Sequence, residues 1–228
     1  MWSYYGAKTN IAHLYPPPKH DRIIEPFAGT ARYALRYFDR DVLLVDKYDV
    51  IVKIWKWLQQ CSPGDILRLP RRIREYQRLD DIRFDCEEAR LLMGFVVGCG
   101  ADRPRNKPTR RKTTERPNHV NYTLERIAKN LFKIRHWSIL HGDYRDIPNQ
   151  TATWFIDPPY QYGGQAYVVG TKNIDFNHLS HWCRNRGGAG HSLREYESNV
   201  DGLQAAGIAA GKPAFYDRSH LVQPANGV

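Results

Sequence analysis

The sequences RIIEPFAGTA at residues 22–31 and DVLLVD at residues 41–46 decide the fold. Residues 41–46 form a continuous apolar run between two acids, which is typical of a strand buried on both faces of a parallel sheet. Residues 22–27 make a shorter apolar strand, and a tight turn containing Gly29 follows it. The order strand, glycine turn, helix, strand and acid is that of a nucleotide-type α/β half-fold. We therefore expect an α/β protein with a parallel sheet.

The middle of the chain changes to a helical pattern. We expect helices at residues 50–58, 65–79, 86–98 and 121–134, with no clear strand among them. Strand patterns return at residues 137–140 and 153–156, and a further helix is expected at residues 175–184. The pattern therefore predicts one α/β domain in two parts, residues 1–46 and 136–187, with a helical, basic insert at residues 47–135.

The charge balance indicates a polyanionic partner. Lys and Arg number 34 against 24 Asp and Glu, which gives a formal net charge of +10, and 12% of the residues are aromatic. Such a chain is a candidate nucleic-acid binder, although a generic basic surface has the same composition. Residues 100–118 concentrate the charge and can equally be a solvated loop. The candidates for DNA contacts in this stretch are Arg103, Arg105, Lys107, Arg110, Arg111 and Lys112.

Composition excludes several classes of protein. A hydrophobic content of 42% supports a packed core and excludes global disorder. No apolar run approaches the roughly 18–20 residues that cross a bilayer, and residues 1–14 are not a secretory signal. The four cysteines include no C-x-x-C pair, so neither a zinc site nor a disulfide framework is expected. We expect a soluble, cytoplasmic monomer without a bound metal.

Acidic residues follow three of the expected strands. These are Asp46, Asp143 and Asp157, the last of which opens the motif DPPY at residues 157–160. Because ligands gather at the carboxyl ends of strands in open α/β sheets, we expect these residues to meet around one pocket. Converging carboxylates and a glycine turn suit a ligand with a ribose and a positive centre. A phosphate pocket would favour the P-loop motif, which this chain lacks.

These motifs resemble those of a known family. YYGAK at residues 4–8, EPFAGTA at residues 25–31, Asp46, Asp143 and DPPY occur in the same order in DNA adenine-N6 methyltransferases of the Dam type (D12 class). The resemblance covers about residues 1–187. It implies a Rossmann-like methyltransferase sheet with an inserted target-recognition region. The implied activity is methyl transfer from S-adenosylmethionine to adenine N6 in double-stranded DNA, as in restriction-modification systems. Ala31 is a departure, because the family often has a second glycine there.

The resemblance also implies roles for the matched residues at the cofactor. Asp46 would hold the ribose hydroxyls, and Asp143 would face the adenine amine of the cofactor. Tyr4 and Lys8 would lie against the cofactor. The turn beneath its methionine part would be formed by residues that include Phe27, Ala28 and Gly29. Without the resemblance, Asp46 can also be a helix N-cap and Asp143 can also cap a turn.

The DPPY motif suits the chemistry of an aromatic amine. Adenine N6 is a poor nucleophile because its lone pair is delocalised into the ring. The Asp157 carboxylate and the Pro158 carbonyl can each accept one N–H, which frees that lone pair for attack on a sulfonium methyl. Pro159 makes the turn rigid, and Tyr160 offers a face for stacking. Because a base inside a duplex cannot reach such a pocket, we expect base flipping, at a cost of roughly a few kcal/mol.

The character of the chain changes after residue 187. Residues 188–228 are rich in Gly and Ala and lack the expected closing strands of the family. One back-translation of residues 217–222, read one base later, encodes TEVIW, which is similar to the way the family tends to end. We therefore hypothesise a frame-shifted tail and expect low solubility or low activity. Sequencing the encoding DNA tests this hypothesis.

Two alternatives stay open. The first is methylation of adenine in RNA or of cytosine N4. Cytosine enzymes of this kind more often have serine at the position of Asp157, which argues against that branch. The second is a DNA-binding relative with an impaired active site, which an aberrant tail would favour. The recognised DNA sequence is not predicted.

Overall fold

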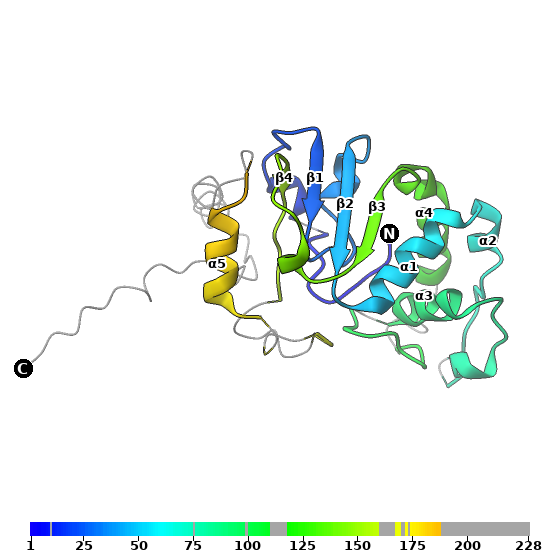
Figure 1. The fold of residues 1–228 in the computed structure, drawn as a ribbon. Coiled ribbons are helices and arrows are strands. Elements are labelled where there is room, and N and C mark those ends of the chain that lie inside the picture. Colours follow the sequence, from blue (N-terminus) through cyan, green and yellow to red (C-terminus); the bar gives the residue numbers. More distant parts are fainter. Residues whose placement is uncertain are drawn as a thin grey trace, which may run out of the picture.

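The computed structural model describes residues 1–9, 11–74, 76–98, 100–109, 118–159, 167–169, 172 and 174–187. At its centre is a four-stranded parallel sheet in the order β3-β2-β1-β4 (Figure 1). The strands are β1 (Arg22–Glu25), β2 (Asp41–Asp46), β3 (Ser138–His141) and β4 (Thr153–Trp154). The α/β class and the parallel sheet are therefore confirmed, and the arrangement is consistent with a Rossmann-like fold.

Helices fill the long connection between β2 and β3. In the described part of the chain these are α1 (Asp49–Gln60), α2 (Pro63–Leu67), α3 (Glu87–Val97) and α4 (His119–Asn130). The helix α5 (Phe176–Arg184) follows β4. Short 3₁₀ turns are η1 (Ala12–Leu14), η2 (Ala34–Arg36), η3 (Leu79–Asp81), η5 (Leu131–Ile134) and η6 (Tyr144–Asp146).

The strands are apolar on both sides because both faces of the sheet are covered. Ile23 and Leu44 belong to a large hydrophobic cluster that continues into α1, α3 and α4. Ile24 and Val45 point the other way, into a smaller cluster that includes Trp182 of α5. This alternation follows from the two-residue period of a strand.

Helix α1 ties the sheet to the turn after β1. Ile51, Ile54 and Leu58 are buried, as their spacing predicts. The Trp55 indole N–H donates to the carbonyl of Gly29 at 2.8 Å. The turn is therefore anchored from a helix as well as from its own strand.

Three helical expectations are wrong in detail. After residue 31 only the 3₁₀ turn η2 forms, because the Ala34 N–H donates to the Glu25 carboxylate instead of a helical carbonyl. The helix expected at residues 65–79 ends at Leu67, since Pro70 disfavours helical backbone at the residue before it. The helix expected at residues 121–134 begins earlier, at His119, and gives way to the 3₁₀ turn η5 after Asn130.

The strand order creates a crevice. The chain leaves β1 to form β2 and β3 on one side, and then returns to place β4 on the other side. In open α/β sheets such a reversal separates the loops at the carboxyl ends of the two strands, and ligands bind between them. The residues that follow β1 and β4, Pro26 and Phe155 onward, are therefore at the position where a ligand site is expected.

The sequence argued against membrane-spanning segments and against a disulfide framework. Among the described residues, no helix combines the length and the apolar character needed to cross a membrane. Cys61, Cys86 and Cys183 are free thiols. Residues 188–228, to which the frame-shift hypothesis applies, lie outside the described residues.

Candidate active site

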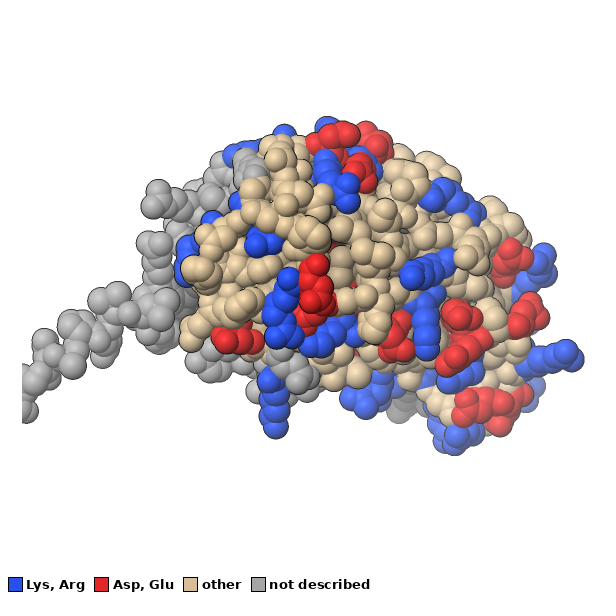
Figure 2. Space-filling view, in the orientation of Figure 1, with Lys and Arg blue, Asp and Glu red and all other residues tan. Residues whose placement is uncertain are grey.

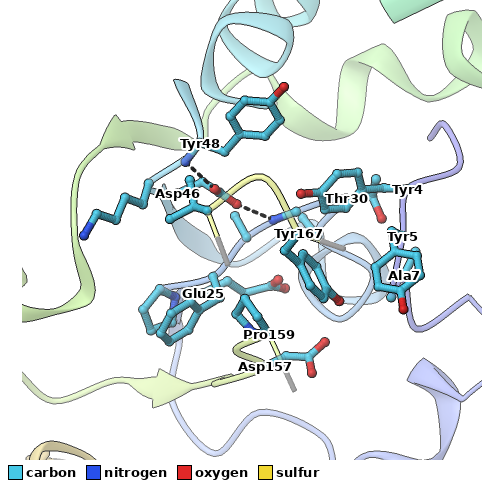
Figure 3. Close-up of a pocket in the computed structure, with 18 of the residues that line it drawn as sticks. Tyr4, Tyr5, Ala7, Glu25, Thr30, Asp46, Tyr48, Asp157, Pro159 and Tyr167 are labelled. Carbon is cyan, nitrogen blue, oxygen red and sulfur yellow. Dashed lines mark hydrogen bonds between the residues drawn. The ribbon is translucent and has the colours of Figure 1, made fainter. Parts of the chain in front are cut away.

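A cleft of about 870 Å³, part of it open to solvent, lies at the carboxyl ends of the strands (Figure 3). The cleft brings together most of the residues that the sequence motifs nominated. These are Tyr4, Lys8, Phe27, Ala28, Gly29, Asp46, Asp143, Asp157 and Pro159. Pro158 is buried and does not line the cleft, and Tyr160 lies outside the described residues.

The turn after β1 has an unusual backbone. Gly29 and Ala31 both have a φ of +46°, in the left-handed region that favours glycine. The Ala28 N–H donates to the carbonyl of Val45 at 3.1 Å, which ties the turn to β2. Left-handed backbone costs an L-residue roughly 1–2 kcal/mol, so Ala31 carries strain that a glycine would not have. This is the position where the resembling family often has its second glycine.

Asp46 is held by the backbone. Its Oδ2 accepts the Gly29 N–H at 2.8 Å and its Oδ1 accepts the Tyr48 N–H at 2.9 Å (Figure 3). Burial raises its pKa to about 6 against these hydrogen bonds. Helix α1 begins at Asp49 with Tyr48 as its N-cap, so the alternative that Asp46 caps this helix is wrong. The carboxylate instead joins the end of β2 to the turn after β1.

Asp143 has a different environment at the edge of the cleft. Its carboxylate accepts hydrogen bonds from Lys47 Nζ at 2.8 Å and from Arg145 Nε at 2.8 Å. Partial burial disfavours the charge, but the hydrogen bonds from Arg145 and Lys47 hold the pKa of Asp143 well below its usual range. Asp143 also N-caps η6, so the alternative that it caps a turn is confirmed. Both oxygens are thus already engaged by cationic partners.

Asp157 lines the cleft from the segment that follows β4. Its Oδ2 is 2.8 Å from Lys8 Nζ, and Lys8 also donates to the carbonyl of Gly6 at 3.1 Å. Burial raises the pKa of Asp157, and the charge of Lys8 opposes that rise. The Phe155 N–H donates to the carbonyl of Ile24 at 2.9 Å, which continues the β4 pairing to within two residues of Asp157.

Glu25 is a site residue that the motif analysis missed. It lines the cleft and is buried, with its Oε1 accepting the Ala34 N–H at 2.6 Å. Burial raises its pKa to about 8 against that hydrogen bond, and the negative charge of Asp157 adds to the rise. Glu25 is the last residue of β1, as Asp46 is the last residue of β2, and an acid in an otherwise apolar strand is the signal that could have identified it.

Aromatic side chains form the wall nearest the N-terminal segment. Tyr4 packs edge-on against Phe95 of α3 with ring centroids 5.5 Å apart. Burial raises the pKa of Tyr4 far above its usual range. Tyr5, Tyr48 and Tyr167 also line the cleft and were not anticipated. Tyr5 belongs to the YYGAK motif, whereas nothing in the local sequence marks Tyr48 or Tyr167, because they reach the cleft only in the folded chain.

The structure describes three of the six basic residues that the sequence nominates for DNA contacts. Arg103, Arg105 and Lys107 are exposed on residues 100–109, and Arg103 pairs with Asp102 at 3.0 Å. Burial raises the pKa of the cleft residue Tyr48, while the charge of Arg103 opposes the rise. Figure 2 shows Lys and Arg interspersed with Asp and Glu over the helical half of the face drawn. Arg110, Arg111 and Lys112 lie outside the described residues.

The comparisons with known proteins add no assignment. No protein-family model matches the chain, and no curated protein is significantly similar to it in sequence.

Proposed function

We propose that this protein transfers a methyl group from S-adenosylmethionine to adenine N6 in double-stranded DNA, with the target base flipped out of the duplex. The observation that carries the proposal is the convergence of Asp46 and Asp157 on one cleft at the reversal point of a parallel sheet. The Asp46 carboxylate can accept hydrogen bonds from ribose hydroxyls, and the Asp157 carboxylate can accept one from an amine. The resemblance in motif order supports the same activity.

The cleft fits this cofactor in charge and in acceptor positions. The Asp46 carboxylate accepts the backbone N–H groups of Gly29 and Tyr48 and a further hydrogen bond from the backbone of Lys47, and of its roughly four lone-pair positions at least one is left for a ribose hydroxyl. Asp157 adds a second carboxylate to the cleft beside Asp46, which suits a ligand bearing a sulfonium better than one bearing phosphates. When bound, the cofactor would supply an electrophilic methyl group on a positively charged sulfur.

The protein's contribution is positioning and electrostatics. Asp157 would accept an N–H of the target amine and so raise the electron density on its nitrogen. The ion pair with Lys8 helps Asp157 to keep its charge in spite of burial. The Pro158 carbonyl is the proposed second acceptor. Arg103, Arg105 and Lys107 would contact phosphates next to the cleft and offset part of the cost of base extrusion.

Methyl transfer to DNA tests the proposal. Purified protein is incubated with tritiated S-adenosylmethionine and unmethylated genomic DNA, and incorporated label is counted. We expect transfer by the wild type and a loss of at least roughly 100-fold in Asp157→Ala, since a preorganised electrostatic contact is removed. Asp39→Ala, an exposed acid outside the cleft, is the matched control.

The acceptor and the site of methylation separate the alternatives. RNA replaces DNA in a parallel reaction, and the nucleosides of the product are separated to distinguish N6-methyladenine from N4-methylcytosine. Transfer that survives Asp157→Ala contradicts the mechanism. Binding of DNA without any transfer by the wild type would favour the impaired DNA-binding relative.

A further inference from the structure

Tyr167 is an aromatic residue of the cleft that belongs to none of the sequence motifs. Tyr167 lines the cleft together with Asp157 and Pro159. Figure 3 shows Tyr167 beside Tyr5. The cleft thus has an aromatic ring on the side of the carboxylate proposed to hold the target amine.

Contacts with the N-terminal segment position this ring. The Tyr5 ring lies edge-on to it, with centroids 5.0 Å apart and planes at 74°, and the Tyr4 ring lies 6.2 Å away at 70°. Gly6 has a φ of +73°, and a Cβ at this residue would come within 1.8 Å of the Tyr167 hydroxyl oxygen. Tyr167 therefore sits directly against a stretch of backbone that has no side chain.

The same short segment connects the ring to Asp157. The Gly6 carbonyl accepts a hydrogen bond from Lys8 Nζ at 3.1 Å, and that nitrogen is 2.8 Å from Asp157 Oδ2. Residues 6–8 thus contact Tyr167 at one end and Asp157 at the other. A planar base that donates an N–H to Asp157 would lie within reach of the Tyr167 ring.

We propose that Tyr167 is a stacking partner of the flipped base, in a base subsite bounded by Tyr5, Asp157, Pro159 and Tyr167. The proposal rests on the proposed function and adds a residue to it. The rings of Tyr4 and Tyr5 are inclined to the Tyr167 ring at 70° and 74°. Because every base has a π-face, stacking supplies affinity without choosing the base.

Tyr5 has a positioning role in this subsite. It packs edge-on against Tyr167, and its backbone N–H donates to the carbonyl of Ala101 at 3.1 Å. Ala101 belongs to the same loop as Arg103 and Arg105. The base subsite is thereby tied to the part of the insert proposed to contact phosphates.

A comparison of two labelled oligonucleotides tests the stacking role. One is single-stranded oligothymidylate with a central adenine, and the other has an abasic site at that position. The ratio of their dissociation constants, measured by fluorescence anisotropy, isolates the contribution of the base. We expect the wild type to prefer adenine, and Tyr167→Leu to reduce this preference by roughly 5- to 150-fold, the range of one base–aromatic stack.

Controls separate stacking from folding. Tyr167→Phe keeps the ring and should retain the preference, and so should Tyr76→Leu, which alters an exposed tyrosine outside the cleft. Tyr167→Met is a second non-aromatic variant if the leucine variant fails to fold. An unchanged preference in the folded non-aromatic variant, or no preference in the wild type, overturns the proposal.

The same preparations are assayed for methyl transfer. Adenine preference that depends on Tyr167 in a protein without transfer would leave the base subsite standing and the proposed function refuted. Methyl transfer by the wild type, together with an adenine preference that is unchanged in Tyr167→Leu, would support the proposed function and refute the base subsite.

Discussion

Lys8 Nζ lies 2.8 Å from Asp157 Oδ2 in the wall of the cleft, with 6% of the lysine side chain and 19% of the aspartate side chain exposed. The pair joins two segments about 150 residues apart in sequence. Burial raises the pKa of Asp157, and Lys8 is the described charge that opposes it. If Asp157 must be ionised to hold an amine, activity depends on Lys8 through the charge of its partner.

Lys8→Met should therefore move the acidic limb of the pH profile of methyl transfer to higher pH. An opposite charge at this distance lowers a carboxyl pKa by roughly 1–3 units. Removing the charge of Lys8 should therefore raise the pKa of Asp157 by a similar amount. The measurement is kcat from pH 5 to pH 9. Lys8→Arg keeps the cation and should keep the profile. An acidic limb that does not move in Lys8→Met would show that Lys8 does not control the charge of Asp157.

Glu25 should make the folded state less stable as pH rises. Its pKa is about 8 in the fold, against an ordinary value near 4.5 in the unfolded chain. Between these values the folded state keeps a proton that the unfolded state has lost. The stabilisation present below pH 4.5 is therefore lost progressively toward pH 8, with uptake of about one proton on folding.

Glu25→Gln removes this titration and keeps an oxygen for the Ala34 N–H. Urea unfolding of both proteins at pH 5, 6.5 and 8 checks the expectation. The decline in the free energy of unfolding should be steeper in the wild type than in the variant. Parallel declines in the two proteins would assign the pH dependence to other groups.

Asp46→Asn should weaken binding of S-adenosylhomocysteine by at least roughly tenfold, the equivalent of one lost hydrogen bond to a charged acceptor. The amide has one acceptor oxygen, so it can satisfy either the Gly29 or the Tyr48 N–H but not both. A loss of stability of about 1–3 kcal/mol should accompany the change, because a backbone donor loses its partner. Calorimetric titration measures the affinity, and Asp39→Asn is the control. Wild-type affinity in Asp46→Asn would remove this residue from the proposed site.

The parts of the fold that the sequence predicted are those with local causes. The apolar run at residues 41–46 needs no partner to be read as a strand, and an acid after a strand lies at the edge where the other strand ends gather. Glu25 lies inside the strand expected at residues 22–27, and only the structure shows that β1 ends at this residue. Tyr167 could not be predicted, since only the fold brings it to Gly6.

Local rules also failed where tertiary contacts competed with them. The helical spacing after residue 31 was overridden by the hydrogen bond from Ala34 to Glu25 and by the left-handed backbone of Ala31. The division into a catalytic part and a recognition insert stays a prediction. The hydrophobic core runs from β1 and β2 into α3 and α4 without a break.

Ala31→Val should destabilise the protein by more than roughly 2 kcal/mol. A β-branched side chain is a steric outlier at a φ of +46°, and Ala31 is only 1% exposed, so the added methyl groups also meet a packed core. Ala31→Gly relieves the backbone strain and loses one buried methyl group, so its stability should stay within about 1 kcal/mol of the wild type. Urea midpoints compare the three proteins. A valine variant as stable as the glycine variant would contradict a left-handed Ala31.

Gly6→Ala should disturb the base side of the cleft more than the cofactor side. The new Cβ would lie 1.8 Å from the Tyr167 hydroxyl oxygen, and the φ of +73° disfavours any L-residue. Because the atom it meets is the end of a side chain, Tyr167 can swing away, and the fold should survive with a loss of roughly 1–2 kcal/mol. Binding of S-adenosylhomocysteine should then change little, whereas the KM for DNA should rise. Gly100→Ala, at a φ of +61° with no atom within 4 Å of the added carbon, carries the same backbone cost without the collision. If both alanine variants raise the KM for DNA equally, the contact between Gly6 and Tyr167 has no part in holding the substrate.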